Sequence, residues 1–162
     1  MTRIVVVGNG MAGARVVDEL LRRDPHLDVT VFGAEAQPAY NRVLLSDVLA
    51  GKRQDVTLSG VDGAVRHVGV SIVSVDRRAR LVTGSDGSVT PYDALVLATG
   101  SEAIVPPVQG IAGPSGLLLD GVFVFRTLAD CAAIAARAKR ATTAVGVGGG
   151  LPGRAAARGL LQ

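Results

Sequence analysis

Three glycines near the N-terminus have the spacing of a phosphate-binding turn. Gly8, Gly10 and Gly13 belong to the segment Gly8-Asn9-Gly10-Met11-Ala12-Gly13, which has the pattern GxGxxG. In such a turn the first glycine allows a tight bend, the second leaves room for a pyrophosphate, and the third lets a helix pack on a strand. The free N–H groups at the start of that helix then face the phosphates. The motif therefore predicts chemistry that depends on a bound dinucleotide.

The residues around the motif are those that a dinucleotide site requires. Residues 4–7 are apolar and predict a strand buried on both faces of a parallel sheet, a helical pattern follows over 11–23, and residues 29–32 predict a second strand. Glu35, 22 residues beyond Gly13, can accept hydrogen bonds from the hydroxyls of an adenosine ribose. A lone GxGxxG would be weak evidence in a chain with 21 glycines. With its strands, helix and acid, the motif favours a dinucleotide site over an empty glycine turn.

The same motif recurs near the C-terminus. Residues 144–147 predict a strand, Gly148, Gly150 and Gly153 repeat the glycine spacing, and 154–161 predict a helix. Pro152 is tolerated if it lies in the first helical turn, where its missing N–H costs nothing. No second strand or acid follows, so an empty turn is a stronger alternative here than at the first motif. Two dinucleotide motifs on one chain imply electron transfer between two dinucleotides.

Between the motifs, the sequence predicts elements that complete one sheet. Residues 43–49 predict a short helix, and the extended segments 70–75, 79–82 and 89–92 predict a small antiparallel ribbon. Residues 92–101 predict another buried strand, which ends in small residues where backbone can approach a ligand closely. The fold class is therefore α/β, with a Rossmann-like parallel sheet and a small antiparallel ribbon, followed by the start of a second Rossmann unit.

Composition suggests how the chain is divided. We expect residues 1–110 to form the first half of one dinucleotide-binding domain. Residues 111–121, rich in glycine and close to a proline pair, are expected to be a linker. Residues 122–162, with an alanine-rich helix from about 128 to 139, are expected to be an incomplete second dinucleotide-binding domain.

Composition also excludes several classes of function. The 162 residues are 48% apolar but only 3% aromatic, and the net charge is +3, which does not indicate a nucleic-acid partner. Cys131 is the only cysteine, so an internal disulfide and a redox cysteine pair are excluded, and too few ligands remain for an iron–sulfur cluster. His26 and His67 lack metal-ligand spacing, and we expect no metal site and no catalytic side chain. No signal peptide or membrane-spanning run is visible, so we expect a soluble, cytoplasmic protein.

Successive blocks of the sequence follow one pattern in order. The blocks are Gly8–Gly13, Phe32–Glu35, Tyr40–Ser46, Val48–Gly51, Tyr92–Ser101, Phe125–Thr127 and Gly148–Gly150. Together they resemble the N-terminal flavin-binding region of the large subunit of NAD(P)H-dependent assimilatory nitrite reductase. The wider group, the two-dinucleotide flavoproteins, includes rubredoxin and ferredoxin reductases.

The resemblance implies FAD at the first motif and NAD(P)H at the second. Around FAD it implies the glycine turn at the pyrophosphate, Glu35 on the ribose, and Arg42 and Arg126 at the phosphates or flavin. The segment at the end of the 92–101 strand would lie beside the FAD. The residues so implied are Gly8, Asn9, Gly10, Met11, Ala12, Gly13, Glu35, Arg42, Ala98, Thr99, Gly100 and Arg126 for FAD, with Gly148, Gly150 and Gly153 for NAD(P)H.

The activity implied by the resemblance is hydride transfer from NAD(P)H to FAD. Electrons would continue to a haem-containing domain that reduces nitrite, which this chain does not contain, so we expect it not to reduce nitrite itself. The sequence departs from the family's pattern in a short segment at 59–69 and in Arg154, where an acid is usual. Two alternatives stay open: a rubredoxin- or ferredoxin-reductase-like flavoprotein, and a catalytically silent, truncated nucleotide-binding module.

Overall fold

The computed structural model describes residues 1–161, and its contacts divide the chain into two compact units. The first unit contains residues 1–40 and 57–101, and the second contains residues 41–56 together with the described chain from 102 onward. The predicted segments 1–110, 111–121 and 122–162 do not coincide with these units, because residues 41–56 pack with the C-terminal part. The predicted domain boundaries stay a prediction.

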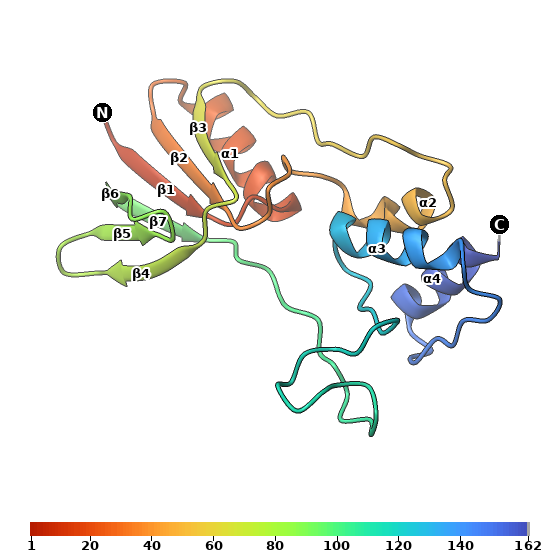
Figure 1. The fold of residues 1–162 in the computed structure, drawn as a ribbon. Coiled ribbons are helices and arrows are strands. Elements are labelled where there is room, and N and C mark those ends of the chain that lie inside the picture. Colours follow the sequence, from red (N-terminus) through yellow and green to blue (C-terminus); the bar gives the residue numbers. More distant parts are fainter. Residues whose placement is uncertain (162) are drawn as a thin grey trace. The chain divides into compact units, whose positions relative to one another are not determined.

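A parallel sheet forms the centre of the first unit (Figure 1). Its four strands lie in the order β3-β2-β1-β7, and every neighbouring pair is parallel. A three-stranded antiparallel ribbon, β4-β5-β6, accompanies the sheet as the sequence predicted. The elements of this unit are β1 (Arg3–Val7), α1 (Met11–Arg23), β2 (Asp28–Gly33), β3 (Ala64–Val68), β4 (Ile72–Asp76), β5 (Leu81–Gly84), β6 (Val89–Pro91) and β7 (Ala94–Leu97).

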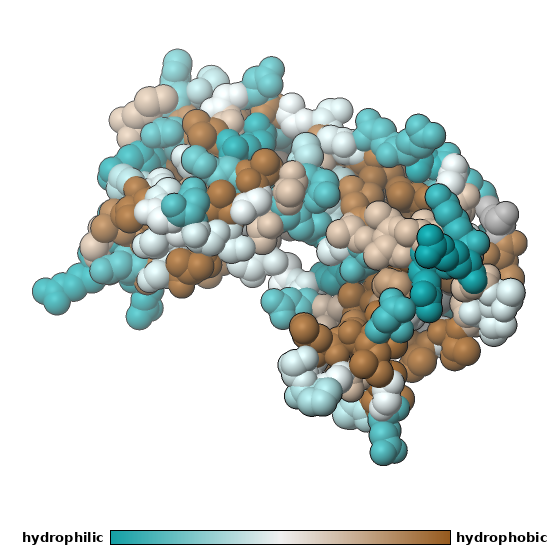
Figure 2. Space-filling model, in the orientation of Figure 1, coloured by the Kyte–Doolittle hydropathy of each residue, from teal (hydrophilic) through white to brown (hydrophobic). Residues whose placement is uncertain are grey.

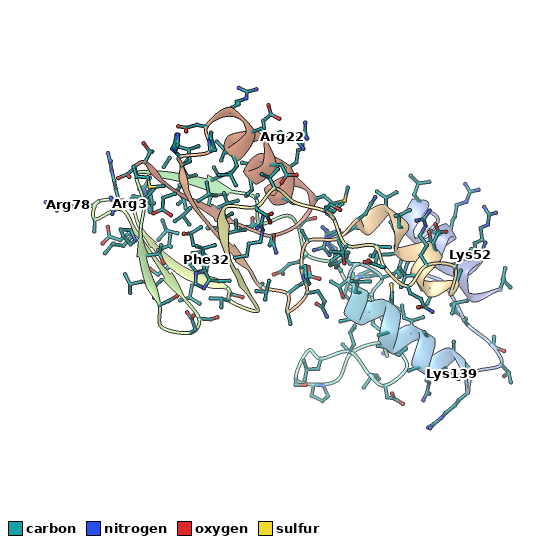
Figure 3. All side chains as sticks on the ribbon, turned by 90° about the horizontal axis from the view of Figure 1, so that it is seen from above. Arg3, Arg22, Phe32, Lys52, Arg78 and Lys139 are labelled. Carbon is teal, nitrogen blue, oxygen red and sulfur yellow. The ribbon has the colours of Figure 1, made fainter. Side chains whose placement is uncertain are left out.

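Strand β1 is buried on both faces, which confirms the prediction from its unbroken apolar run. Successive side chains of a strand point to opposite faces, so alternate residues enter different cores. On one face the strand packs against α1, and on the other against the ribbon, near Phe32 (Figure 3). The first core contains Ile4, Val6, Val17, Leu21, Val29 and Val31, and the second contains Val5, Val7, Phe32, Val82 and Tyr92.

Strands β3 and β7 differ from the sequence prediction. The alternating run 64–68 was not assigned as a strand, yet it pairs with β2 as an edge strand. Strand β7 was predicted to be buried, but Leu97 is 67% exposed. The prediction was wrong because β7 is the other edge of the sheet, so its apolar composition does not reflect burial on two faces.

The second unit consists of short helices around α2. A 3₁₀ turn (Arg42–Leu44) runs into α2 (Leu45–Leu49), as the predicted helix over 43–49 implied, and α2 packs against α3 (Leu128–Ala138) and α4 (Leu151–Leu160). The close approach of α4 depends on Gly159, where a Cβ would press on the Ser46 carbonyl oxygen at 3.2 Å and on Leu49. Apolar residues also lie on the visible surface of this unit (Figure 2).

The strand predicted at 144–147 is absent. These residues have no regular secondary structure, no described segment pairs with them, and Val145 and Val147 are 87% and 73% exposed. A strand requires a neighbour for its N–H and C=O groups, so apolar composition alone does not produce one. The prediction of the following helix was right, and Pro152 lies in its first turn.

An ion pair joins the first residues of β1 to the start of β7. The Arg3 guanidinium donates to both carboxylate oxygens of Asp93, with N···O distances of 2.8 and 3.1 Å, and the Asp93 N–H donates to the Arg3 carbonyl at 2.8 Å. The hydrogen bonds and charge of Arg3 hold the pKa of Asp93 well below its usual range. The ionised carboxylate therefore stabilises the folded state at neutral pH.

We predict that Asp93→Asn lowers the melting temperature at pH 7 and that the difference from wild type disappears in acid. Because the pKa of Asp93 is lowered on folding, its contribution is complete above the unfolded value of about 4 and is lost as pH falls below it. Thermal melts between pH 7 and pH 2 measure this. Asp62→Asn is the matched control, since Asp62 is exposed and its side chain has no ion pair among the described residues. A pH-independent difference would contradict the prediction.

Helix α3 begins with a capping box, which gives a second test. The Thr127 hydroxyl accepts from the Asp130 N–H at 3.1 Å, and the Asp130 carboxylate accepts from the Thr127 N–H at 2.8 Å. We expect Thr127→Ala to lower the free energy of unfolding by about 1 kcal/mol, whereas Thr127→Ser retains the cap. Urea denaturation followed by circular dichroism measures both. Equal losses in the two variants would show that the hydroxyl does not cap the helix.

Candidate dinucleotide-binding site

The first glycine turn connects β1 to α1 and leaves no room for side chains at two positions. Gly8 has φ +114°, a left-handed conformation that favours glycine, and a Cβ there would overlap the Ala98 carbonyl. A Cβ at Gly13 would overlap the Gly8 carbonyl, so the helix lies directly against the turn. The sequence-based roles of both glycines, a tight bend and close helix packing, agree with this geometry.

Gly10 differs from these two glycines because the space beside it is open. A Cβ at Gly10 would meet no atom within 4 Å, and the residue has φ −91°, which any side chain can adopt. Nothing in the packing of the described residues therefore requires glycine here. The open space is where a pyrophosphate could approach the backbone.

The helix that starts at this turn has no protein cap. Among the described residues, no side chain accepts a hydrogen bond at the Gly10 N-cap of α1, and the first turn contains no acid. The first N–H groups of a helix have no partner within the helix. Helix α3 of the same chain satisfies these donors with a capping box, whereas α1 leaves them available to an anionic ligand. Met11 and Ala12, in the predicted set, contribute backbone N–H groups to this position.

The predicted ribose acid lies just beyond the tip of β2. Glu35 is half-buried, and its carboxylate accepts a hydrogen bond from the buried Tyr40 hydroxyl with an O···O distance of 2.6 Å. The Glu35 carbonyl accepts from the Gly69 N–H at 2.9 Å, which holds the backbone after β2 in place. Asn9 packs at the same end of the sheet, against Gly33. Sequence reasoning did not identify the contact of Tyr40 with Glu35.

The end of β7 lies beside the glycine turn. The Ala98 N–H donates to the Val7 carbonyl at 2.7 Å, and the Ala98–Thr99 peptide lies against Gly8. Thr99 and Gly100 are exposed, and Gly100 has φ +75°. The first unit thus brings the end of β7 together with the turn after β1, where sheets of this type bind ligands at the carboxyl ends of their strands.

The two predicted arginines lie in the second unit and are adjacent there. The Arg42 guanidinium donates to the Arg126 carbonyl at 3.1 Å. The Arg126 N–H in turn donates to the carboxylate of Asp130, the acid of the α3 capping box, at 2.9 Å. The capping box of α3 therefore also holds the backbone of Arg126, whose carbonyl accepts the hydrogen bond from Arg42. Contact of either arginine with a nucleotide at the first unit stays a prediction.

The second glycine turn repeats the local geometry of the first. Gly148 has φ +119°, and a Cβ at Gly153 would overlap the Gly148 carbonyl. The Arg154 N–H donates to the Gly150 carbonyl at 3.1 Å, as the Ala14 N–H donates to the Gly10 carbonyl at 2.9 Å. Helix α4 has no side-chain cap and no acid in its first turn among the described residues.

A groove beside this second turn contains cationic side chains that sequence reasoning did not group. It lies between α2 and α4 and has a volume of about 580 Å³. Arg154 and Arg158 are one helical turn apart, so they fall on the same face of α4, while Lys52 follows α2. The groove is lined by Ser46, Asp47, Ala50, Lys52, Leu151, Arg154, Ala155, Arg158 and Gly159.

The remaining candidate side chains have structural surroundings. Cys131 is 2% exposed, and burial raises the pKa of its thiol to about 11, so it is protonated and not nucleophilic at neutral pH. The His67 ring stacks on Phe32 at a centroid distance of 4.7 Å. Over residues 1–161 no cluster of metal-binding side chains is found, and no helix there is both long and apolar enough to span a membrane.

Known proteins are similar to this chain in sequence and in fold. The large subunit of nitrite reductase [NAD(P)H] from Klebsiella oxytoca is 42% identical over 98% of this chain, which spans 17% of that protein. The assimilatory nitrate reductase electron transfer subunit of Bacillus subtilis is 36% identical over 98% of the chain and 21% of its own length. The structure of the water-forming NADH oxidase from Lactobacillus brevis, bound to NADH, matches with a TM-score of 0.85 and 25% identity, over 99% of this chain and 37% of that one.

These comparisons confirm the resemblance to nitrite reductase large subunits and the α/β dinucleotide-binding fold. The chain spans about a fifth of the length of the two relatives. FAD and NAD(P)H, the cofactors expected from the sequence, are those of the family that the comparisons identify. Residues 2–160 match the pyridine nucleotide-disulphide oxidoreductases, and the chain belongs to this family of enzymes.

Proposed function

We propose that the chain is the flavin- and pyridine-nucleotide-binding part of an NAD(P)H-dependent oxidoreductase of the nitrite reductase large-subunit type. FAD binds at the first glycine turn, and NAD(P)H binds at the second. When bound, the flavin supplies the redox chemistry by accepting a hydride from the reduced nicotinamide. Electrons then pass to a haem-containing domain that reduces nitrite, which lies outside this chain. The similarity to the Klebsiella oxytoca large subunit supports this assignment.

The observation that carries the proposal is the pair of uncapped helix N-termini. Helices α1 and α4 each follow a GxGxxG turn and lack a side-chain cap within the described chain, whereas α3 has one. A glycine N-cap, Gly10 in α1 and Gly150 in α4, costs only about a few tenths of a kcal/mol relative to a capping side chain, so leaving these N–H groups open is cheap. A pyrophosphate supplies oxygen acceptors at that point and its charge is favoured by the helix dipole. Glu35 provides the acceptor for the ribose of the first nucleotide.

The chain's own residues would bind and orient the two nucleotides. At the first turn the α1 N–H groups hold the pyrophosphate and Glu35 accepts from the ribose. Arg42, whose position the Arg126 carbonyl supports, pairs with a phosphate or contacts the flavin. At the second turn, the cationic groove with Arg154 and Arg158 raises the local concentration of anionic nucleotides.

A second candidate differs only in the electron acceptor. The similarity to an electron transfer subunit favours delivery to a separate protein, as in rubredoxin- or ferredoxin-reductase-like flavoproteins. The flavin chemistry is the same in both cases. The coding sequence next to this chain decides between them, because a sirohaem domain fused downstream belongs only to the nitrite reductase type.

The test is a titration of the purified chain with FAD, followed by flavin fluorescence and by thermal stability. We expect saturable quenching and a raised melting temperature, because a ligand that binds only the folded state stabilises it. A folded chain that neither quenches FAD nor gains stability would overturn the proposal. That result would favour a catalytically silent nucleotide-binding module.

We predict that Gly10→Val lowers FAD affinity at least about tenfold, or 1.4 kcal/mol, while leaving the fold intact. The side chain fits the open space beside Gly10, which is the space assigned to the pyrophosphate. Gly146→Val is the matched control, because Gly146 is equally open and lies outside the turn. Unchanged FAD affinity in Gly10→Val would place the cofactor elsewhere. Circular dichroism of both variants checks that they fold.

A further inference from the structure

The hydrogen bond between Tyr40 and Glu35 joins a buried donor to a half-buried acid. Tyr40 is 3% exposed, and its hydroxyl lies 2.6 Å from Oε2 of Glu35. O–H···O⁻ bonds of this length belong to the stronger, charge-assisted class. Removing the hydroxyl while keeping the ring would therefore affect the hydrogen bonding of the Glu35 carboxylate more than the packing of the Tyr40 ring.

The backbone that carries Tyr40 is itself held in place. Tyr40 forms an antiparallel bridge with Thr57, and the Leu58 N–H donates to the Ala39 carbonyl at 2.8 Å. Residues 39–40 and 57–58 therefore form a short pair within the first unit. The donor is fixed by backbone pairing and by burial, whereas the acid that receives its hydrogen bond is a long side chain with several rotatable bonds.

An ionised carboxylate has about four acceptor sites on its two oxygens. One bond from Tyr40 uses one of them and restrains the orientation of the carboxylate plane. A side chain held in its binding orientation before the ligand arrives also loses less conformational freedom when the ligand binds.

We propose that Tyr40 is a positioning residue for ribose recognition. Its hydroxyl holds the Glu35 carboxylate in an orientation that accepts the 2′- and 3′-hydroxyls of the adenosine ribose. This inference rests on the proposed function, since it takes Glu35 as the ribose ligand. A purely structural Tyr40 would fill the space between the paired segments and contribute nothing to the discrimination between ribose and deoxyribose.

The test compares the affinities of ADP and 2′-deoxy-ADP, measured by displacement of FAD, in the wild type and in Tyr40→Phe, Glu35→Gln and Tyr92→Phe. We expect the wild type to prefer ADP about tenfold, the order of a lost hydrogen bond to a charged group. In Tyr40→Phe the preference falls at least threefold, and in Glu35→Gln it is lost. Tyr92→Phe, the matched control at the other tyrosine of the chain, keeps it.

The possible outcomes separate the inference from the function on which it rests. A wild type that binds neither FAD nor ADP overturns both. A preference that survives Glu35→Gln overturns the ribose role of Glu35, and with it the role of Tyr40. A preference lost in Glu35→Gln but kept in Tyr40→Phe overturns only the positioning role, even if Tyr40→Phe weakens both nucleotides equally.

A measurement on the unsubstituted chain covers the case in which Tyr40→Phe does not fold. With ¹³Cζ-labelled tyrosine the chain has two such resonances, and Tyr92→Phe assigns them. We expect the Tyr40 resonance to shift when ADP binds, because its acceptor gains two further donors, and to shift less with 2′-deoxy-ADP. Equal shifts with both nucleotides would contradict the proposal.

Discussion

Direct contact between backbone atoms at the first glycine turn is the constraint on which the first unit depends. The turn after β1, the start of α1 and the end of β7 meet there with no space for a side chain at Gly8 or Gly13. Interiors are packed closely enough that even one added methyl group must displace something. A Cβ at either position would separate α1 or β7 from β1. The same contact sets the site, because it places the α1 donors and the Ala98–Thr99 peptide side by side.

The stability of this arrangement comes from the two cores on either side of β1. A fully buried valine contributes about 1.5–3 kcal/mol relative to an exposed one, and β1 alone places Val5 and Val6 at 1% exposure or less. That burial far exceeds the cost of the glycine N-cap of α1, which is about a few tenths of a kcal/mol relative to a capping side chain. The fold can therefore leave the first α1 donors without a side-chain cap. Helix α3, which has only one fully buried residue, Cys131, keeps its capping box instead.

The features that the sequence predicted correctly are those that depend on residues close to one another in the chain. The apolar run of β1, the glycines and the amphipathic helix α1 each have a local physical cause, and the structure contains them all. Strand β3 was missed because an edge strand buries only part of its surface, so its alternation is weak. The burial of β7 was overestimated because composition does not show which strand lies at an edge. The Tyr40–Glu35 and Arg42–Arg126 contacts depend on chain geometry beyond any spacing rule; the second joins residues 84 positions apart.

The second glycine turn shows which features of the first turn have local causes and which depend on tertiary neighbours. It repeats the left-handed first glycine, the overlap of the third glycine with the first carbonyl and the uncapped helix, yet residues 144–147 form no strand. The turn geometry therefore does not require a strand before it, since glycines and the first helical turn suffice. A strand instead needs hydrogen-bonding neighbours, which β1 finds in β2 and β7. The glycine pattern therefore accounts for the local geometry of the turn, whereas the strand before it depends on hydrogen-bonding partners elsewhere in the fold.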